Sequence, residues 1–367
     1  MAAALLACIL SGTGGCQESV GSAGGNDLLL WRAPLEARDQ GSISVPAMDG
    51  ARVYAIGGGL VALDARNGSV SWRARLTKYA PISVAFRGGR VFAVEELAYA
   101  FDAATGRELW RFTPDSDGAL GESTADDGAF YFGTGSHRVY ALDAADGRPL
   151  WSTDVGPDWE HTGIVLGVTV SGDTLYAAVR QYNAANGFIS TGWIFALDRG
   201  TGRVLWSYRN GEGKDLRSVS SAPTVAGRLL LASDLHGNSF FAVDRVTGKE
   251  VWRVNGVPGY VGPREAPVAV GETAYVSSSD RHVYAVEVQT GRIVWKRKLP
   301  GSSNGFAVCG DRIFAAWLGL SILDRNTGRV LYESEPESAD YPTSGFAVHE
   351  DRVFVLGNRA AYAYRCR

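Results

Sequence analysis

The sequence predicts an all-β protein: an eight-bladed propeller built from four-stranded antiparallel blades, with the last blade closed by the N-terminal strand. Three observations lead to this prediction. One motif, in which an acidic residue, a glycine and an aromatic residue keep the same spacing, occurs seven times in 367 residues. The chain also contains 46 Gly and 10 Trp, a composition typical of short strands joined by tight turns. Finally, the two ends of the repeat region resemble two halves of one further unit. A period of about 40 residues with four strands in each repeat is the size of a propeller blade.

The overall composition is that of an ordered globular protein. Hydrophobic residues make up 46% of the chain and charged residues 20%. The formal net charge is −3, whereas nucleic-acid-binding domains usually carry a basic patch. We therefore expect no nucleic-acid partner.

The first residues resemble an export signal. Residues 2–10 form an apolar run that is too short to cross a bilayer as a helix, and small residues follow it. The run leads to Cys16, an arrangement similar to a bacterial lipoprotein signal, in which the cysteine is lipidated and becomes the first mature residue. We therefore predict a signal peptide over 1–15, a lipid anchor on Cys16 and a flexible tether over 16–27. Lipidation of Cys8 and a plain secretory signal are the alternatives, and each of them also implies export.

One copy of the motif, "ALDAADGRPLW" at 141–151, explains why its residues recur. Apolar side chains alternate over 138–144, which predicts a strand. Asp143 can accept hydrogen bonds from the amides of a turn, and Gly147 can adopt a positive φ, so the motif predicts a β-hairpin. Trp151 follows the glycine at a constant offset, which indicates packing between adjacent sheets. The docking aromatic residues are Trp31, Trp72, Trp110, Trp151, Trp206, Trp252, Trp295 and Tyr332.

The ends of the repeat region predict how the ring closes. Trp31 has no acid-and-glycine hairpin before it, and 360–366 has the strand of the motif but no glycine and tryptophan after it. Joined, the two fragments make an eighth blade whose outer strand comes from the N-terminus. The propeller domain is therefore predicted over 28–367.

The cysteines do not predict a metal site, because Cys8, Cys16, Cys309 and Cys366 form no CxxC or zinc-binding spacing. A disulfide between Cys309 and Cys366 is not expected either. These two residues fall on different strands of different repeats.

The pattern Ala-x-Asp-x-x-x-Gly-x-x-x-Trp resembles the tryptophan-docking motif of the pyrroloquinoline-quinone (PQQ) propeller superfamily. The resemblance covers residues 28–366, and six of the seven copies end in Trp. It implies eight four-stranded blades. The superfamily includes quinoprotein alcohol dehydrogenases and the propeller lipoprotein of the outer-membrane β-barrel assembly machinery, so the fold alone does not define the function.

The residues of the dehydrogenases find no match in this chain. The resemblance implies adjacent cysteines beside the quinone, a Glu, Asn and Asp set around calcium with an Asp base, and in many members a CxxCH haem site; none can be matched here. We therefore predict a protein that is not an enzyme and uses no cofactor or metal.

We expect a protein-binding scaffold of the cell envelope. It would be a periplasm-facing lipoprotein, in the outer membrane, that contacts the membrane only through its lipid anchor. Its partners would be envelope proteins, with outer-membrane protein assembly as the named instance. A PQQ-dependent oxidoreductase and a small-molecule sensor that uses the channel mouth are the alternatives.

Long connections that differ from repeat to repeat predict the partner-binding face. The step from Trp151 to Trp206 is the longest between docking residues, and the extra length falls in 156–163 and 180–193. By strand order these connections lie on the face opposite the acid–Gly hairpins, and such insertions often mark the binding face of a repeat protein; drifting, tolerated loops are the other interpretation. The candidate partner-binding residues are Trp159, Glu160, His161, Tyr182, Arg217, Tyr260, Arg264 and Glu265.

Overall fold

The structure is a computed structural model, and it describes most of the chain beyond the N-terminal segment. The described residues are 28–35, 45–56, 59–76, 83–115, 118–156, 163–182, 190–211, 217–234, 239–257, 266–278, 280–303, 305–334, 342–357 and 359–367. Within these ranges the regular secondary structure is all strand, which confirms the predicted all-β class. None of the described residues belongs to a helix long and apolar enough to cross a membrane.

The described strands form six four-stranded sheets and one eight-stranded sheet. The four-stranded sheets, each in spatial order, are β2 (Ala47–Met48), β3 (Arg52–Ile56), β4 (Leu60–Asp64), β5 (Val70–Ala74); β6 (Ser83–Arg87), β7 (Arg90–Val94), β8 (Ala98–Asp102), β9 (Glu108–Phe112); β18 (Thr224–Ala226), β19 (Leu229–Ser233), β20 (Ser239–Asp244), β21 (Glu250–Asn255); β22 (Val268–Val270), β23 (Thr273–Ser277), β24 (His282–Glu287), β25 (Ile293–Lys298); β26 (Gly305–Cys309), β27 (Arg312–Ala316), β28 (Leu320–Asp324), β29 (Val330–Glu333); and β30 (Pro342–His349), β31 (Arg352–Gly357), β32 (Ala360–Arg365), β1 (Leu29–Pro34).

The eight-stranded sheet contains two consecutive repeats. Its strands are β10 (Ala119–Ala125), β11 (Ala129–Thr134), β12 (Arg138–Asp143), β13 (Pro149–Asp154), β14 (Gly163–Ser171), β15 (Thr174–Tyr182), β16 (Ser190–Asp198) and β17 (Val204–Asn210). A single parallel pair, Glu122 with Gly167, joins β10 to β14, so this sheet resembles two ordinary sheets that touch along their inner strands.

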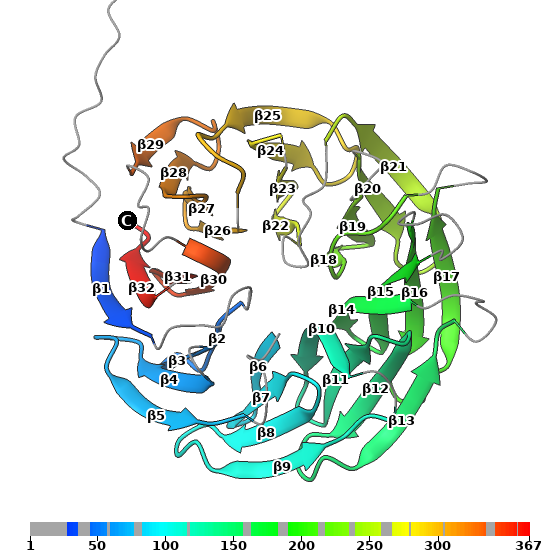
Figure 1. The fold of residues 1–367 in the computed structure, drawn as a ribbon. Coiled ribbons are helices and arrows are strands. Elements are labelled where there is room, and N and C mark those ends of the chain that lie inside the picture. The colour runs from blue at the N-terminus through cyan, green and yellow to red at the C-terminus, as the bar shows by residue number, and fades with distance from the viewer. Residues whose placement is uncertain are drawn as a thin grey trace, which may run out of the picture.

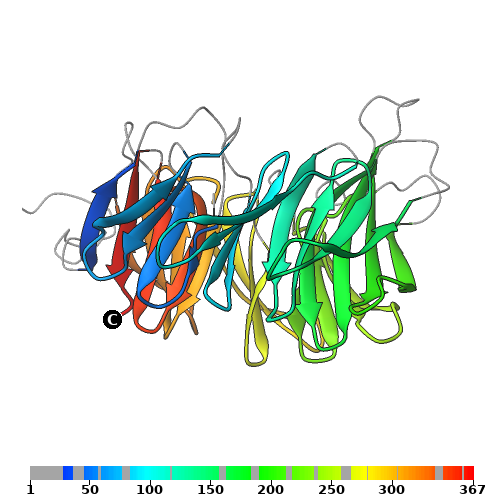
Figure 2. The same ribbon diagram turned by 90° about the horizontal axis from the view of Figure 1, so that it is seen from below.

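The sheets stand side by side in a ring (Figure 1). In chain order, the first strand of each repeat lies nearest the centre of the ring and the fourth lies at the outer edge (Figure 1). Seen from the side, the strands run between two faces of the ring (Figure 2). We call the face with the acid–Gly hairpins the hairpin face. The opposite face, where β7, β15 and β19 end and β8, β16 and β20 begin, is the loop face.

The first and last strands of the described chain share one sheet. β1 pairs antiparallel with β32, and Trp31 lies opposite Ala363. The N-terminal strand therefore occupies the outer position that a fourth strand occupies in the other repeats.

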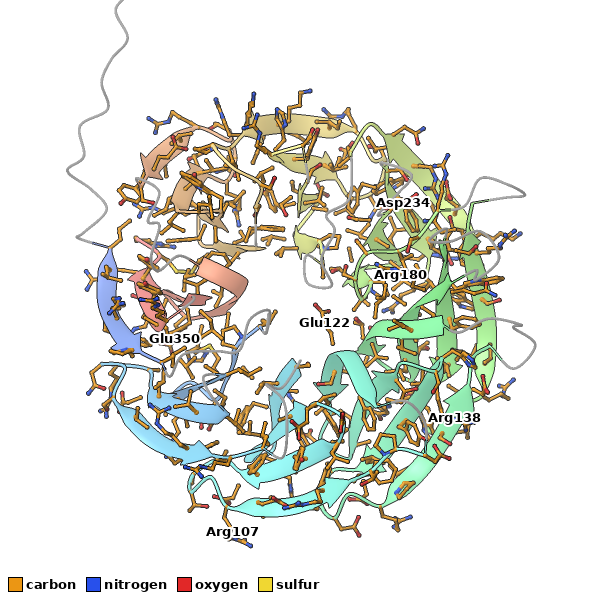
Figure 3. The ribbon with its side chains drawn as sticks, in the orientation of Figure 1. Arg107, Glu122, Arg138, Arg180, Asp234 and Glu350 are labelled. Atoms are coloured by element: carbon orange, nitrogen blue, oxygen red, sulfur yellow. A yellow bond between two sulfur atoms is a disulfide. The ribbon has the colours of Figure 1, made fainter. Side chains whose placement is uncertain are left out.

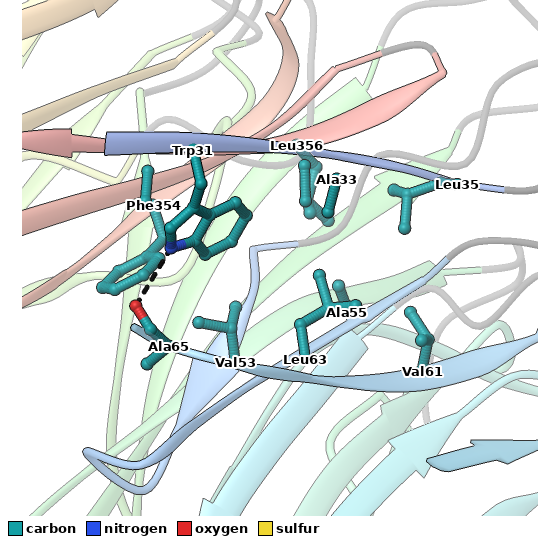
Figure 4. Packing of buried hydrophobic residues seen from close by; sticks show 12 residues of the cluster. Trp31, Ala33, Leu35, Val53, Ala55, Val61, Leu63, Ala65, Phe354 and Leu356 are labelled. Carbon is teal, nitrogen blue, oxygen red and sulfur yellow. Dashed lines mark hydrogen bonds between the residues drawn. The ribbon is translucent and has the colours of Figure 1, made fainter. Parts of the chain in front are cut away.

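The hydrophobic core is divided among the interfaces between neighbouring sheets. One such cluster contains Trp31, Phe354 and Leu356 from the sheet that holds both chain ends, and Val53 and Leu63 from the next sheet (Figure 4). Each sheet thus buries both faces against its neighbours, and removal of one sheet would expose two interfaces.

Cys309 and Cys366 form a disulfide, and the expectation that they would remain separate is wrong. Their Cα atoms are 5.7 Å apart although 57 residues separate them in sequence. Cys309 ends β26, and its sulfur lies 3.6 Å from the carbonyl oxygen of Glu350 in the neighbouring sheet. Different strands of different repeats can therefore come within bonding distance, because the ring places the hairpin-face ends of adjacent sheets side by side.

Candidate functional site

The hairpin face repeats one contact between each sheet and the next. The indole N–H of a docking tryptophan donates a hydrogen bond to the carbonyl oxygen of the residue that follows the motif acid in the next repeat. The pairs are Trp31 to Ala65 at 3.1 Å, Trp72 to Ala103 at 3.0 Å, Trp110 to Ala144 at 3.2 Å, Trp151 to Arg199 at 2.9 Å, Trp206 to Arg245 at 3.2 Å, Trp252 to Val288 at 2.9 Å and Trp295 to Arg325 at 3.1 Å. Figure 4 shows the first of them.

The motif glycine serves both the turn and the docking ring. Gly106 has φ +73°, a region that side chains rarely adopt. A Cβ atom at this position would also lie 2.6 Å from Cδ2 of Trp72. The glycine is therefore required twice, once by its own backbone and once by the aromatic residue of the preceding sheet.

The motif acid is engaged in the turn. The carboxylate of Asp64 accepts hydrogen bonds from the Arg66 guanidinium and amide, and these bonds lower the pKa of Asp64 to about 2. A hydrogen bond from Arg228, followed by the Thr247 amide, likewise lowers the pKa of Asp244. We infer a structural role for these carboxylates, since their oxygens are occupied by the turn.

The loop face differs because the interior beneath it is polar. In the described chain, the buried polar and charged residues lie at the loop-face ends of the strands or in the adjoining connections. They are Ser83, Glu95, Thr134, Thr191, Asn210, Ser218, Ser220, Ser221, Ser233, Asp234, Ser239, Ser277, Ser278, Ser303 and Ser321. About half of them belong to the boundary between β14–β17 and β18–β21.

Arg253 is the centre of this boundary. Its guanidinium donates to the hydroxyl of Tyr208 at 2.8 Å and to Oδ1 of Asn210 at 2.9 Å, both on β17 of the preceding sheet. Within its own sheet it donates to Ser239 Oγ at 2.6 Å and to Glu250 Oε2 at 2.6 Å. One side chain thus connects two sheets by charge-assisted hydrogen bonds.

The surroundings of Arg253 favour its charge. The guanidinium lies 4.6 Å from the ring centroid of Phe241, and 4.0 Å separates its Nη1 from Oδ2 of Asp234, which is fully buried. Burial acts against the ionised form of Glu250, but hydrogen bonds from Arg253 and Tyr208 outweigh it and lower the pKa of Glu250. Burial and the bond to Glu250 raise the pKa of Tyr208, so that its hydroxyl stays protonated.

The same network holds the segment that leads into β18. Asn210 donates to the carbonyl of Ser218 at 3.1 Å, and Arg180 donates to Ser218 Oγ at 2.9 Å and to the carbonyl of Val219 at 3.3 Å. Figure 3 shows Arg180 and Asp234 in this sector of the ring, with Glu122 nearer the centre. We name the set Arg180, Tyr208, Asn210, Ser218, Asp234, Ser239, Glu250 and Arg253 the polar junction.

The structure describes only two of the predicted partner-binding residues. Arg217 lies beside the polar junction. Its carbonyl oxygen accepts a hydrogen bond from the amide of Gly192 at 2.7 Å. Its positive charge helps to lower the pKa of Glu250. Tyr182 ends β15 on the loop face, where its backbone pairs with Ser190. Cys16, Trp159, Glu160, His161, Tyr260, Arg264 and Glu265 lie outside the described residues.

Sequence reasoning missed the polar junction, and only a weak signal pointed to it. Arg253 directly follows a docking tryptophan, but so do Arg73 and Arg111 in other repeats. No motif links Arg253 to Asp234 or Asn210, which come from other strands. Within the described part of the chain, no group of three or more His, Cys, Asp or Glu side chains is placed to hold a metal ion.

The repeated docking contact and the ring of sheets define a repeat protein of the PQQ-like propeller superfamily. Within it, the chain matches the PQQ_2 family model, described as outer membrane protein assembly factor BamB, over residues 19–111, 94–252 and 236–318. The chain belongs to this family, and the predicted resemblance is confirmed.

Characterised relatives fall into two groups, enzymes and outer membrane protein assembly factors. The chain is 30% identical to tetrathionate hydrolase of Acidithiobacillus ferrooxidans over 65% of this chain and 41% of that protein. It is 28% identical to BamB of Yersinia pestis over 64% of this chain and 61% of that protein. With BamB of Shewanella oneidensis the identity is 26%, over 80% of this chain and 77% of the relative. The first two matches thus cover less than two thirds of the relatives' own lengths.

Solved structures of an assembly factor and of an enzyme both share the fold of this chain. BamB from Moraxella catarrhalis has a TM-score of 0.68 at 18% identity and covers 91% of this chain and 97% of its own. Quinohemoprotein alcohol dehydrogenase from Comamonas testosteroni has a TM-score of 0.70 at 16% identity, over 95% of this chain and 78% of its own. At these identities the likeness concerns the fold alone.

Proposed function

We propose that this protein is a non-catalytic scaffold of the bacterial cell envelope that binds partner proteins during the assembly of outer-membrane proteins. The similarity to BamB along most of both chains, 80% of this one and 77% of the Shewanella oneidensis protein, carries the proposal. The match to tetrathionate hydrolase covers 41% of that enzyme, so more than half of the enzyme lies outside the match.

The strand pattern supports the propeller part of the proposed organisation. The eight-stranded sheet counts as two blades joined by the Glu122–Gly167 pair, which makes eight blades in all, and β1 supplies the outer strand of the last one. Residues 1–15 would be the signal peptide, Cys16 the lipidated residue and 16–27 the tether. The Cys309–Cys366 disulfide supports export, because disulfides persist mainly outside the reducing cytosol.

The partner site would lie on the loop face, next to the polar junction. The hairpins are near copies of one another and offer little for selective recognition, whereas among the described residues the polar junction belongs to one boundary. A base held by hydrogen bonds across two sheets is also a suitable support for recognition loops, because less conformational entropy is lost when a partner binds.

Site-specific photocrosslinking tests this proposal. A photoreactive residue replaces Arg217 on the loop face, and a matched one replaces the exposed Arg107 on the hairpin face (Figure 3). We expect the position of Arg217 to crosslink a component of outer-membrane protein assembly and the position of Arg107 to give no such product. Identical products from both positions, or none from either, would remove the support for the loop face. A Trp159→Ala/Arg264→Ala double variant that melts like the parent but captures fewer partners would extend the site to those loops.

An oxidoreductase of the PQQ-dependent type is the second candidate, favoured by 25% identity to quinoprotein ethanol dehydrogenase of Pseudomonas aeruginosa over 48% of this chain and 26% of that enzyme. Titration of the purified protein with PQQ and calcium separates the two proposals. The scaffold should show no saturable quinone absorbance and no alcohol oxidation. Calcium-dependent, saturable PQQ binding would favour the enzyme.

A further inference from the structure

The outer strand β25 differs in charge from the other outer strands of the ring. It ends in Lys296, Arg297 and Lys298, and all three side chains are exposed. Nitrogen-bearing side chains project outward along this strand at the rim (Figure 3). Within the described chain, no other outer strand carries three consecutive cations.

Equivalent positions in other repeats show why the charge of β25 remains uncompensated. On β9, Arg111 pairs at 2.7 Å with Glu108, three residues earlier, and on β21 Arg253 pairs at 2.6 Å with Glu250 in the same relation. On β25 the residue three positions before Lys296 is Ile293. The carboxylate that neutralises the cation in those two repeats is absent from this one.

The acids near β25 already have partners. Glu287 pairs with Arg292 at 3.4 Å, and Asp280 pairs with His282 at 3.2 Å. Among the described residues, no carboxylate lies within ion-pair distance of Lys296 or Lys298. The positive charge of this edge is therefore available to a partner.

The geometry of the strand indicates the shape of that partner. Among the described strands, β25 is the terminal strand of its sheet and pairs only with β24, so none of them occupies its other backbone edge. Side chains alternate along a strand, so Lys296 and Lys298 project from the same side. Arg297 projects from the other side, where its Nε donates to the carbonyl of Gly328 at 2.7 Å.

We propose that β25 is a docking strand for an extended acidic segment of a partner protein, which adds to the sheet edge and places alternate carboxylates against Lys296 and Lys298. Lysines on an open edge discourage pairing with a second copy of the same strand, because like charges would meet. The same lysines attract a strand of opposite charge, so one feature both excludes and selects partners. Strand addition supplies affinity through the backbone and selectivity through alternate side chains.

A peptide titration tests the proposal on the purified protein. The probe is a fluorescein-labelled peptide of alternating Thr and Glu, and a peptide of alternating Thr and Lys is its control. We expect saturable binding of the acidic peptide that weakens with salt, and no binding of the basic one. The Lys296→Glu/Lys298→Glu variant should bind the acidic peptide at least fivefold more weakly.

Two controls make the result decisive. The Arg203→Glu/Lys249→Glu variant changes the net charge equally at two exposed hairpin positions and should bind within twofold of the parent. A peptide with alternate backbone amides N-methylated should lose binding if the strand adds to the edge. Equal losses in both charge variants, or undiminished binding of the methylated peptide, would overturn the proposal. So would binding of phosphatidylglycerol vesicles in place of the peptide, because that outcome assigns the patch to a lipid surface.

Discussion

The hairpin face and the loop face solve the same problem, the joining of neighbouring sheets, in different ways. On the hairpin face a tryptophan, a glycine and a backbone carbonyl make the same contact at seven boundaries. Toward the loop face the boundary between β14–β17 and β18–β21 is held by Arg253 and its polar partners, a network that no other boundary of the described chain repeats. A contact that repeats defines the architecture, whereas a contact made once distinguishes one sector of the ring and is where selective recognition can arise.

Of the changes that test this comparison, removal of the N-terminal strand should lower the stability of the protein most. Deletion of residues 26–34 removes β1 together with Trp31, so one sheet loses its outer strand and the hairpin of the next repeat loses its docking ring. We expect a large fall in the urea midpoint and earlier proteolysis. Deletion of 17–25 should leave both unchanged. If the two truncations unfold at the same urea concentration, β1 has no stabilising role.

Loss of one docking tryptophan should cause the next largest fall in stability. Trp110 is 8% exposed and packs against Phe92 and Phe130. Trp110→Ala should therefore cost about 3–5 kcal/mol of unfolding free energy, and Trp206→Ala, whose ring is half-buried, should fall at the lower end. Leu205→Ala is the matched control, since its side chain is 42% exposed and its loss should cost less than about 0.5 kcal/mol. A Trp110 variant that unfolds like the control would contradict the docking role.

The polar junction can be compared directly with an ion pair of the same spacing elsewhere. Arg253→Ala removes a guanidinium that is 14% exposed and should cost about 2–3 kcal/mol, because hydrogen bonds to charged groups are lost and Asp234 remains buried. Arg111→Ala breaks the equivalent pair on β9, where the arginine is 52% exposed and solvent screens the pair, so its loss should lower stability much less than the loss of Arg253. Chemical denaturation of both variants measures the difference. Equal losses would show that the polar junction is no more than another surface ion pair.

The smallest expected effect is on how the stability of the protein depends on pH, and it concerns the motif acids. Asp64 has its pKa lowered to about 2 by its bonds to Arg66, so its contribution to stability is present above the ordinary carboxyl pKa near 3.8 and is lost as the pH falls toward 2. Asp64→Asn should flatten the dependence of the urea midpoint on pH between these values. Asp115→Asn, at an exposed position between β9 and β10, serves as the control. An unchanged pH profile in the Asp64 variant would mean that the turn does not depend on this charge.

Several features of this protein follow from its sequence alone, because they depend on residues close together in the chain. Asp143, Gly147 and Trp151 specify a hairpin and a docking ring by local turn chemistry and fixed spacing. The repetition of that spacing then indicates a closed ring of similar sheets. The family resemblance and the all-β class came from this local information, since each repeat carries its own copy of it.

Tertiary structure decided the features that depend on residues far apart in the chain. Cys309 and Cys366 are bonded because adjacent sheets bring their strand ends together, which no local pattern records. Arg253 meets Asn210 and Asp234 for the same reason, and the uncompensated charge of β25 emerges only when its edge and its neighbours are placed in space. Each repeat specifies its own turns through short-range hydrogen bonds. The residues that differ between repeats obtain their roles only from the side chains that the folded ring packs against them.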